Sequence, residues 1–219
     1  MGGGPHRVRD VMTGAAVAVG RKTLFKDIVE RMVQWQVSAL PVLDGDGRVV
    51  GVVSEADLLP KEEFRDSDPD RLTQLRRLPD LAKAGAVAAE QLMSAPAVTV
   101  RADATLAEAA RAMALHTVKR LPVVNAEGLL EGVVSRGDLL KVFLRPDGDL
   151  ADEIRRDVID PLFPDPVEPV HIMVTEGVAT LTGRVPSAAA ERIPLALRLT
   201  QGVEGVVGVD CRLTTSDLV

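Results

Sequence analysis

The chain has 219 residues, almost half of them hydrophobic, which is enough for one large domain or two modest ones and disfavours a disordered protein. Its net charge of −6 disfavours nucleic acid as a partner, because phosphate binding requires clustered Lys and Arg. The single cysteine, Cys211, rules out an intramolecular disulfide, and no hydrophobic run approaches the roughly 20 residues that span a bilayer. Together with a start that lacks the hydrophobic core of a secretory signal, these features predict a cytoplasmic protein.

The sequence contains one pattern twice, with the second copy 81 residues after the first. Leu40-Pro41-Val42 returns as Leu121-Pro122-Val123, and Gly51-Val52-Val53-Ser54 returns as Gly132-Val133-Val134-Ser135. The same offset relates Val11-Met12 to Leu92-Met93, Met32 to Met113, and Asp57-Leu58-Leu59 to Asp138-Leu139-Leu140. Five blocks in one register, without a gap, indicate an internal repeat.

Each copy is predicted to form a strand, an amphipathic helix, two strands joined by a turn, and a second helix. In the first copy these are residues 16–19, a helix carrying Leu24, Ile28, Met32 and Trp35, residues 39–43 and 48–54, and a helix from Glu55. In the second copy they are residues 97–100, a helix carrying Leu106, Ala109, Ala110 and Met113 behind a Thr105–Glu108 capping box, residues 120–124 and 130–135, and a helix from Arg136. The predicted order is therefore β-α-β-β-α, twice.

Residues 60–88 separate the two copies and are charged and interrupted by prolines. A helix is expected over residues 71–86, with a break at Pro79, and the segment as a whole is interpreted as a solvated connector.

From Leu150 the pattern changes to a helix, a β-hairpin around Glu176-Gly177, a second helix capped by Ser187, and a last strand over residues 203–213. The predicted order is α-β-β-α-β, and Pro194 is expected to kink the second helix. Residues 150–219 contain eleven Asp and Glu against six Arg, so most of the negative charge of the chain lies in this part.

The doubled unit resembles the CBS domain, which occurs in tandem pairs called Bateman modules; the two Leu-Pro-Val and two Gly-Val-Val-Ser-x-x-Asp segments carry the resemblance over residues 8–143. The resemblance implies an α+β fold in which units 8–59 and 89–143 pack as a pseudo-two-fold pair, after an N-terminal tail over residues 1–7. It also implies a homodimer, and clefts that bind AMP, ATP, NAD or S-adenosylmethionine as regulatory ligands.

Two explanations fit the Ser54-x-x-Asp57 and Ser135-x-x-Asp138 segments. A Ser that caps a helix, with an Asp in its first turn, stabilises that helix without any ligand. The same helix start can bind a phosphate, and the resemblance to CBS domains implies that the Asp holds the ribose hydroxyls while the Ser lies near the phosphate or sugar.

The residues before the second strand differ between the copies. Ser38 and Ala39 are similar to nucleotide-contacting positions in the AMP-binding regulatory subunit of an energy-sensing kinase, and Arg120 takes the place of a phosphate-contacting base. The resulting hypothesis is a site with Arg120 and Asp138 that prefers charged nucleotides, and a site with Ser38 and Asp57 that prefers less phosphorylated ligands. A solvated Arg120 at a strand edge is the alternative.

The C-terminal part resembles a BON domain over residues 150–215, after a linker at 144–149 and before a tail at 216–219; Glu176-Gly-Val-Ala-Thr-Leu-Thr-Gly183 and Gly202-Val-Glu-Gly-Val206 carry the resemblance. BON domains are commonly linked to phospholipid or envelope binding. The negative charge of this part disfavours anionic headgroups, so an unknown protein partner is expected rather than a membrane.

No acid–base pair, nucleophile set or phosphate-binding glycine loop is visible, and His6, His116 and His171 are too scattered to suggest a metal site. The sequence therefore predicts a non-catalytic regulatory protein that senses an adenosine ligand and relays binding to the BON-like domain. The alternative is a structural adaptor in which the CBS pair dimerises and the BON-like domain binds phospholipid or envelope components.

Overall fold

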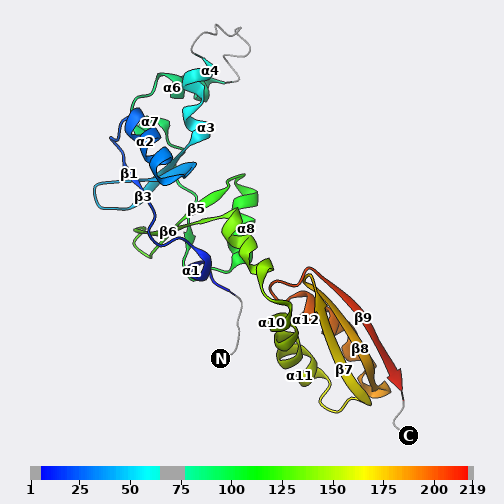
Figure 1. Ribbon diagram of the computed structural model, residues 1–219. Coiled ribbons are helices and arrows are strands. Elements are labelled where there is room, and N and C mark those ends of the chain that lie inside the picture. The colour runs from blue at the N-terminus through cyan, green and yellow to red at the C-terminus, as the bar shows by residue number, and fades with distance from the viewer. Residues whose placement is uncertain (1–5, 65–76, 217–219) are drawn as a thin grey trace. The chain divides into compact units, whose positions relative to one another are not determined.

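The computed structural model describes residues 6–64 and 77–216, which divide into two compact α+β units (Figure 1). The first unit comprises residues 7–136, and the second comprises residues 137–216 together with His6. Within the described residues the first unit contains two three-stranded sheets and the second contains one. No helix in the described part of the chain is long and apolar enough to cross a membrane.

The first copy of the repeat forms the expected β-α-β-β-α unit. Strand β1 (Val19–Gly20) runs parallel to β2 (Ala39–Leu43), and β2 pairs antiparallel with β3 (Val49–Ser54). Helix α2 (Phe25–Trp35) packs its buried face on this sheet, and α3 (Glu55–Leu58) follows β3 directly. The first strand is shorter and begins later than the sequence predicts.

The second copy repeats this unit, and each of its elements begins 81 residues after its counterpart. Its elements are β4 (Val100–Arg101), α8 (Leu106–Leu115), β5 (Arg120–Val124), β6 (Leu130–Ser135) and α9 (Arg136–Leu140). The pairing is again parallel between the first two strands and antiparallel between the last two. The predicted order of elements is confirmed in both copies.

The predicted capping box starts helix α8. The Thr105 N–H donates to the Glu108 carboxylate at 2.8 Å, and the Glu108 N–H donates to Thr105 Oγ1 at 3.2 Å. The Thr105 N–H and the Thr105 hydroxyl, which donates to the same carboxylate at 3.0 Å, both favour its charged form and so hold the pKa of Glu108 below its usual value.

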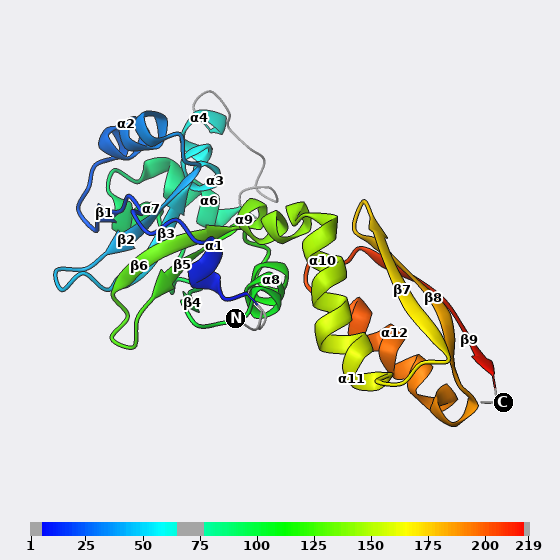
Figure 2. The same cartoon turned by 60° about the horizontal axis from the view of Figure 1, so that its bottom comes forward.

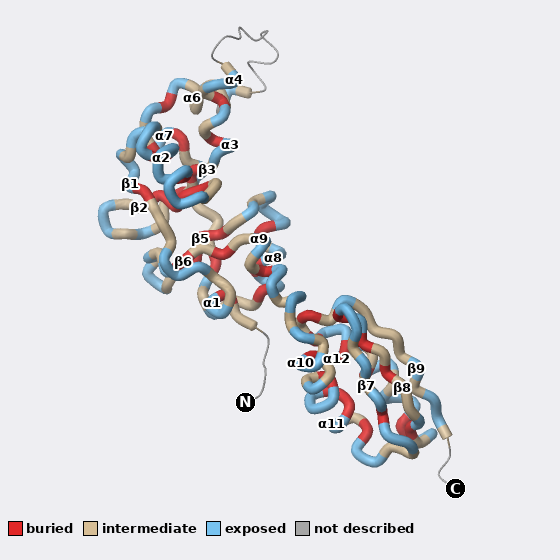
Figure 3. The backbone as a smooth tube through the Cα atoms, viewed as in Figure 1, coloured by how far each residue is buried: buried red, intermediate tan, exposed pale blue. Residues whose placement is uncertain are grey.

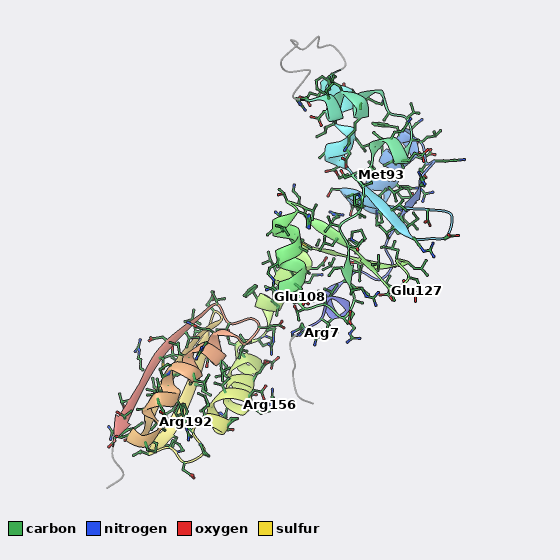
Figure 4. The ribbon with its side chains drawn as sticks, turned by 180° about the vertical axis from the view of Figure 1, so that it is seen from behind. Arg7, Met93, Glu108, Glu127, Arg156 and Arg192 are labelled. Carbon is green, nitrogen blue, oxygen red and sulfur yellow. The ribbon has the colours of Figure 1, made fainter. Side chains whose placement is uncertain are left out.

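The segment that precedes the first copy is built into the second copy. Helix α1 (Val8–Val11) begins with a hydrogen bond from the Val8 N–H to the Ala104 carbonyl oxygen, at 2.9 Å. Beyond this helix, Thr13 exchanges backbone hydrogen bonds of 2.9 and 3.0 Å with Val133 of β6. Figure 4 shows Arg7, just before α1, next to Glu108 of α8. The sequence start of the first copy is therefore a structural part of the second.

The exchange is reciprocal. Helix α7 (Ala89–Leu92) precedes the second copy, but the Ala89 N–H donates to the carbonyl oxygen of Thr23 in the first copy, at 2.9 Å. Ser94 then exchanges hydrogen bonds of 2.9 and 3.1 Å with Val52 of β3. Each copy thus completes its partner, and neither is a closed unit by itself.

Two glycines make room for these crossings. A Cβ atom added to Gly132 would lie 2.7 Å from the Thr13 carbonyl oxygen, and one added to Gly51 would lie 2.5 Å from Sδ of Met93 (labelled in Figure 4). Real Cβ atoms do not approach other atoms so closely. This explains why the Gly-Val-Val and Met segments recur in one register: each glycine receives the segment of the other copy.

The two sheets of the first unit face each other, since residues of β2 and β3 line one small gap together with residues of β5 and β6. Those residues are Ala39, Pro41, Val52, Arg120, Pro122 and Val133. Buried residues concentrate along β2 and β5, the central strands of the two sheets (Figure 3).

The connector between the copies is folded, so the interpretation as a solvated linker is wrong for its described residues. Helix α4 (Pro60–Glu63) packs against α6 (Leu78–Gly85). Lys61 Nζ donates to the carbonyl oxygen of Ala84 at 2.9 Å, and Arg77 Nε donates to Asp80 at 2.8 Å.

The expected break at Pro79 stays a prediction, because it requires a helical segment before Arg77 and residues 65–76 lie outside the described residues. Helix α6 begins at Leu78, so Pro79 lies in its first turn, where an amide has no intrahelical partner and proline is tolerated. Residues 71–76, where the sequence predicts the start of this helix, lie outside the described residues.

The second unit has the predicted α-β-β-α-β order. Its main elements are α10 (Asp147–Ile154), β7 (Glu168–Thr175), β8 (Val178–Pro186), α12 (Ile193–Gln201) and β9 (Gly208–Ser216). The sheet order is β7-β8-β9, with β8 and β9 parallel, and the helices cover one face of the sheet (Figure 2). The connecting segments are the 3-10 helices η1 (Lys141–Leu144) and η3 (Ser187–Arg192), the π-helix η2 (Arg155–Ile159) and α11 (Asp160–Leu162).

Helix α10 begins earlier than expected, at Asp147 rather than Leu150. The Asp147 carboxylate accepts hydrogen bonds from the N–H groups of Glu176 and Gly177, each at 2.9 Å. A residue assigned to the linker therefore holds the turn of the β7–β8 hairpin.

Two expectations for the second helix of this unit are wrong. Pro194 lies in the first turn of α12, where it removes no helix hydrogen bond, so it does not kink the helix. Ser187 is the first residue of η3 and makes no capping hydrogen bond with its side chain.

The crossing over β6 generates a stability prediction. Gly132→Ala should lower the free energy of unfolding by about 1–3 kcal/mol, because the new methyl group meets backbone that cannot move aside. Gly14→Ala, in the same crossing segment but with no atom within 4 Å of its Cβ position, is the matched control and should be near neutral. Urea unfolding of both variants measures the difference, and equal stabilities would contradict the crossing.

Candidate functional site

A pocket of about 260 Å³ lies between the two copies of the repeat. Four segments line most of it: residues 38–39 at the start of β2, 54–57 where β3 passes into α3, 96–98 before β4, and 117–120 up to the start of β5. Because the sheets face each other and the preceding segments are exchanged, both copies contribute to this one cavity.

The pocket brings together five of the seven residues that the sequence singled out. These are Ser38, Ala39, Ser54, Asp57 and Arg120. Ser135 and Asp138 are not among the described residues that line it.

Asp57 is the most enclosed polar residue of the pocket, with only 8% of its surface exposed. Its Oδ2 accepts hydrogen bonds from the Ser54 N–H at 2.8 Å and from the Ser54 hydroxyl at 2.6 Å. Its Oδ1 accepts a hydrogen bond from the Ser94 hydroxyl at 3.2 Å and pairs with the ammonium group of Lys83. The helix-capping explanation of Ser54 and Asp57 is therefore satisfied in part, and it leaves Asp57 at the pocket wall.

Arg120 joins the two copies across the pocket. Its Nη2 donates to the hydroxyl of Ser38 at 2.7 Å. Ser38, Glu55 and Arg120 also line a neighbouring hollow of about 330 Å³ next to the end of α2, so this hydrogen bond lies where the two hollows meet. A cationic group is thus placed on the side of the pocket that faces the β2 start.

The sequence-based hypothesis assigned Arg120 and Asp57 to different sites, and the structure places both in one pocket. The reason is the facing of the sheets, which brings the start of β5 to the cleft beside α3. Position in the second copy does not decide which cleft a residue lines.

The corresponding residues of the second copy have other partners. Ser135 lies opposite Arg120 in the pairing of β5 and β6. The side chain of Asp138 is 14% exposed and pairs with Lys141 Nζ at 2.7 Å, three residues along the chain. Asp57 pairs with Lys83 of the connector, 26 residues away in the chain, and Asp138 pairs with Lys141, three residues away.

Three residues at or next to the pocket were not predicted from the sequence. Ser94, in the exchanged segment, and Thr117, which has a left-handed backbone conformation with φ of +55°, line the pocket. Lys83, in the connector, is not among the described residues that line the pocket but pairs with Asp57. The recurrence of Val11-Met12 as Leu92-Met93 could have indicated that the segment containing Ser94 has a structural role.

Comparison with known proteins agrees with this architecture. A model of the CBS domain matches residues 8–61 and 89–145, and a model of the BON domain matches residues 146–217. The chain belongs to the CBS-domain family and carries a C-terminal BON domain.

Relatives of the CBS pair are found in archaea and plants. The uncharacterized protein MJ1426 of Methanocaldococcus jannaschii is 29% identical over 153 residues, which cover 63% of this chain and 90% of that protein. The chloroplastic protein CBSX2 of Arabidopsis thaliana is 31% identical over 157 residues, 65% of each chain.

A crystal structure of CBSX2 in complex with AMP is similar to this chain, with a TM-score of 0.56 and 32% identity, covering 64% of this chain and 97% of that one. The CBS pair of protein MJ0100, crystallised with 5′-methylthioadenosine and S-adenosyl-L-methionine, has a TM-score of 0.50 at 17% identity, covering 64% of this chain and 97% of that one, and shows the shared fold alone.

The strained backbone at the pocket wall can be tested. A β-branched residue in the left-handed region is unfavourable by about 1–2 kcal/mol, and Asn tolerates this region. Thr117→Asn should therefore raise the free energy of unfolding by about 1 kcal/mol. Gln36→Asn, at the equivalent position of the first copy with φ of +51°, should gain less because Gln is not branched. Thermal unfolding measures both, and a lower melting temperature for Thr117→Asn would show that the strain is outweighed by other contacts.

Proposed function

We propose that this protein is a non-catalytic regulatory protein whose CBS pair binds an adenosine-containing ligand of the AMP and ATP class. The observation that carries the proposal is the presence of Asp57 and Arg120 in one cavity lined by both copies. An enclosed carboxylate and a guanidinium in one cavity suit a ligand that has hydroxyl groups at one end and phosphate at the other.

The chemistry of each group supports this assignment. An ionised carboxylate accepts hydrogen bonds from two neighbouring hydroxyls, which a ribose offers. The planar donor fork of Arg matches phosphate oxygens, and such charge-assisted bonds are stronger than neutral ones. Ala39, Ala97 and Val98 also line the pocket and offer apolar surface for a base.

A relative of the chain supports the same ligand class. The cavity itself, at about 260 Å³, is slightly smaller than the roughly 300 Å³ at which small-molecule sites begin. CBSX2, whose CBS pair is 32% identical, was crystallised with AMP. NAD and S-adenosylmethionine remain within the proposed class because they contain the same adenosine group.

The proposal includes a relay from the CBS pair to the BON domain, in which a ligand shifts the chain between two arrangements that it binds with different affinity. Two residues, Arg145 and Pro146, separate η1, which follows α9 of the second copy, from α10 of the BON domain. The partner of the BON domain is proposed to be a protein.

A homodimer through the CBS pair is a further part of the proposal. Helix α2 exposes Val33 by 72% and Trp35 by 55%, and helix α8, its counterpart, exposes Leu115 by 80%. Such exposed apolar side chains on equivalent helices suit a symmetric contact.

The dimer can be tested by light scattering on the full chain. Val33→Asp should convert the dimer to a monomer, since it places a charge in the apolar contact. Lys26→Asp changes a side chain of the same helix that is 87% exposed and should leave the dimer intact. A wild-type monomer at all concentrations would contradict this part of the proposal.

The ligand class can be tested by isothermal titration with AMP, ATP and adenosine. Arg120→Ala should weaken AMP binding by about tenfold or more, because it removes a charge-assisted contact to phosphate, and should change adenosine binding little. Lys22→Ala removes an exposed cation outside the pocket and serves as the control.

Two results would contradict the proposal. Unchanged AMP affinity in Arg120→Ala would remove the phosphate assignment. If AMP, ATP, NAD and S-adenosylmethionine all fail to raise the melting temperature of the wild-type protein, the sensing function is wrong, because a ligand that binds only the folded state must stabilise it.

A further inference from the structure

The Asp57 carboxylate accepts four hydrogen bonds from protein groups. The donors are the Ser54 N–H, the Ser54 hydroxyl, the Ser94 hydroxyl and the Lys83 ammonium group. A carboxylate has about four lone-pair positions, two on each oxygen. Hydroxyl groups of a ligand at Asp57 therefore compete with one of these four donors.

Three of the four donors are fixed close to Asp57. The Ser54 groups are three residues away in the chain, at the strand end that starts α3. Ser94 is held on both sides of its backbone by Val52, with hydrogen bonds of 2.9 and 3.1 Å. The backbones of Ser54 and Ser94 cannot move away from Asp57 without disrupting the start of α3 or the exchange between the copies.

Lys83 is the donor that can leave. It is 26 residues from Asp57 in the chain, its side chain is long and 20% exposed, and it is not among the described residues that line the pocket. An ammonium group is strongly hydrated, so its release into water is less unfavourable than the loss of a fixed donor. A ligand that takes the Oδ1 position of Asp57 thus acts on Lys83.

We propose, building on the function proposed above, that the ribose hydroxyls of the ligand and Lys83 compete for Asp57, so that the connector helix α6 responds to occupancy of the pocket. Lys83 lowers the affinity of the pocket for ligands that carry both ribose hydroxyls, and the ligand in turn loosens α6. The coupling is reciprocal, as linkage requires.

The construction of α6 makes it responsive. It has eight residues, and an isolated helix of this length is not stable in water, so its contacts decide whether it forms. Besides the Lys83–Asp57 pair, it is held by the bond from Lys61 Nζ to the Ala84 carbonyl oxygen. Arg77 at its start pairs with Glu63 of α4, outside the pocket. Loss of the Asp57 contact removes the ion pair that joins α6 to the pocket wall and leaves the packing of α6 against α3 and α4.

The test is isothermal titration of the full chain with AMP and with 2′,3′-dideoxyadenosine monophosphate, which lacks both ribose hydroxyls. Lys83→Met should bind AMP about fivefold or more tightly than the wild type and should bind the dideoxy compound unchanged. Lys83→Arg, which keeps a cation at Asp57, should bind AMP about as weakly as the wild type does. Lys26→Met, at an exposed position of α2, is the control for loss of a lysine.

The outcomes separate this inference from the function on which it rests. If the wild type and Lys83→Met both bind no AMP, the proposed function and the inference fail together. If the wild type binds AMP and Lys83→Met binds it equally or more weakly, the inference alone is overturned, since Lys83 then contacts or supports the ligand.

Hydrogen exchange on the wild type keeps the inference testable if Lys83→Met does not fold. Saturation with AMP should increase amide exchange in α6 relative to that in α2, whose contacts do not involve Lys83. Unchanged or slower exchange in α6 would overturn the inference.

Discussion

The structure depends on a reciprocal crossing, in which the segment before each CBS copy passes over the glycine of the other copy. A Cβ atom added to Gly132 would collide with the carbonyl oxygen of Thr13, and one added to Gly51 would collide with the side chain of Met93. The crossings join the two copies into one folding unit, and they bring residues 96–98 next to Asp57. The pocket is thus a consequence of the exchange, and a single copy would lack both its second wall and Arg120.

Within that pocket, polar side chains from distant parts of the chain hydrogen-bond or pair with one another. Arg120 of the second copy binds Ser38 of the first, and Asp57 collects donors from its own copy, from the exchanged segment and from the connector. A buried charge must be paired to be tolerated. The same pairs that stabilise the pocket are the ones that a ligand would have to rearrange, which links binding to the conformation of the protein.

Much of the fold could be predicted from the sequence because the repeat shows the pattern of each helix and strand of the CBS unit twice. The β-α-β-β-α order, the Thr105–Glu108 capping box and the hairpin at Glu176 depend on local patterns. What failed depends on tertiary context. Pro194 was interpreted as an interruption, but helix α12 begins next to it, and the start of a helix is set by packing rather than by the proline alone.

The candidate site was predicted as a set of residues rather than as an arrangement. Ser38, Ala39, Ser54, Asp57 and Arg120 meet in one pocket, but the sequence assigned Arg120 to the other cleft, since nothing in a repeat indicates which copy completes which cleft. Lys83 was not predicted because an isolated lysine in a charged connector is indistinguishable from a solvated one. Its role follows only from its contact with Asp57.

The central claim is that the exchanged CBS pair forms an adenosine site at Asp57 and Arg120. A crystal structure of the full chain with AMP tests it most directly. We expect AMP density in the pocket between the copies, with the ribose hydroxyls at Asp57, the phosphate at Arg120 and Lys83 displaced from Asp57. AMP bound elsewhere on the CBS pair, with the contacts of Asp57 and Arg120 unchanged, would contradict it.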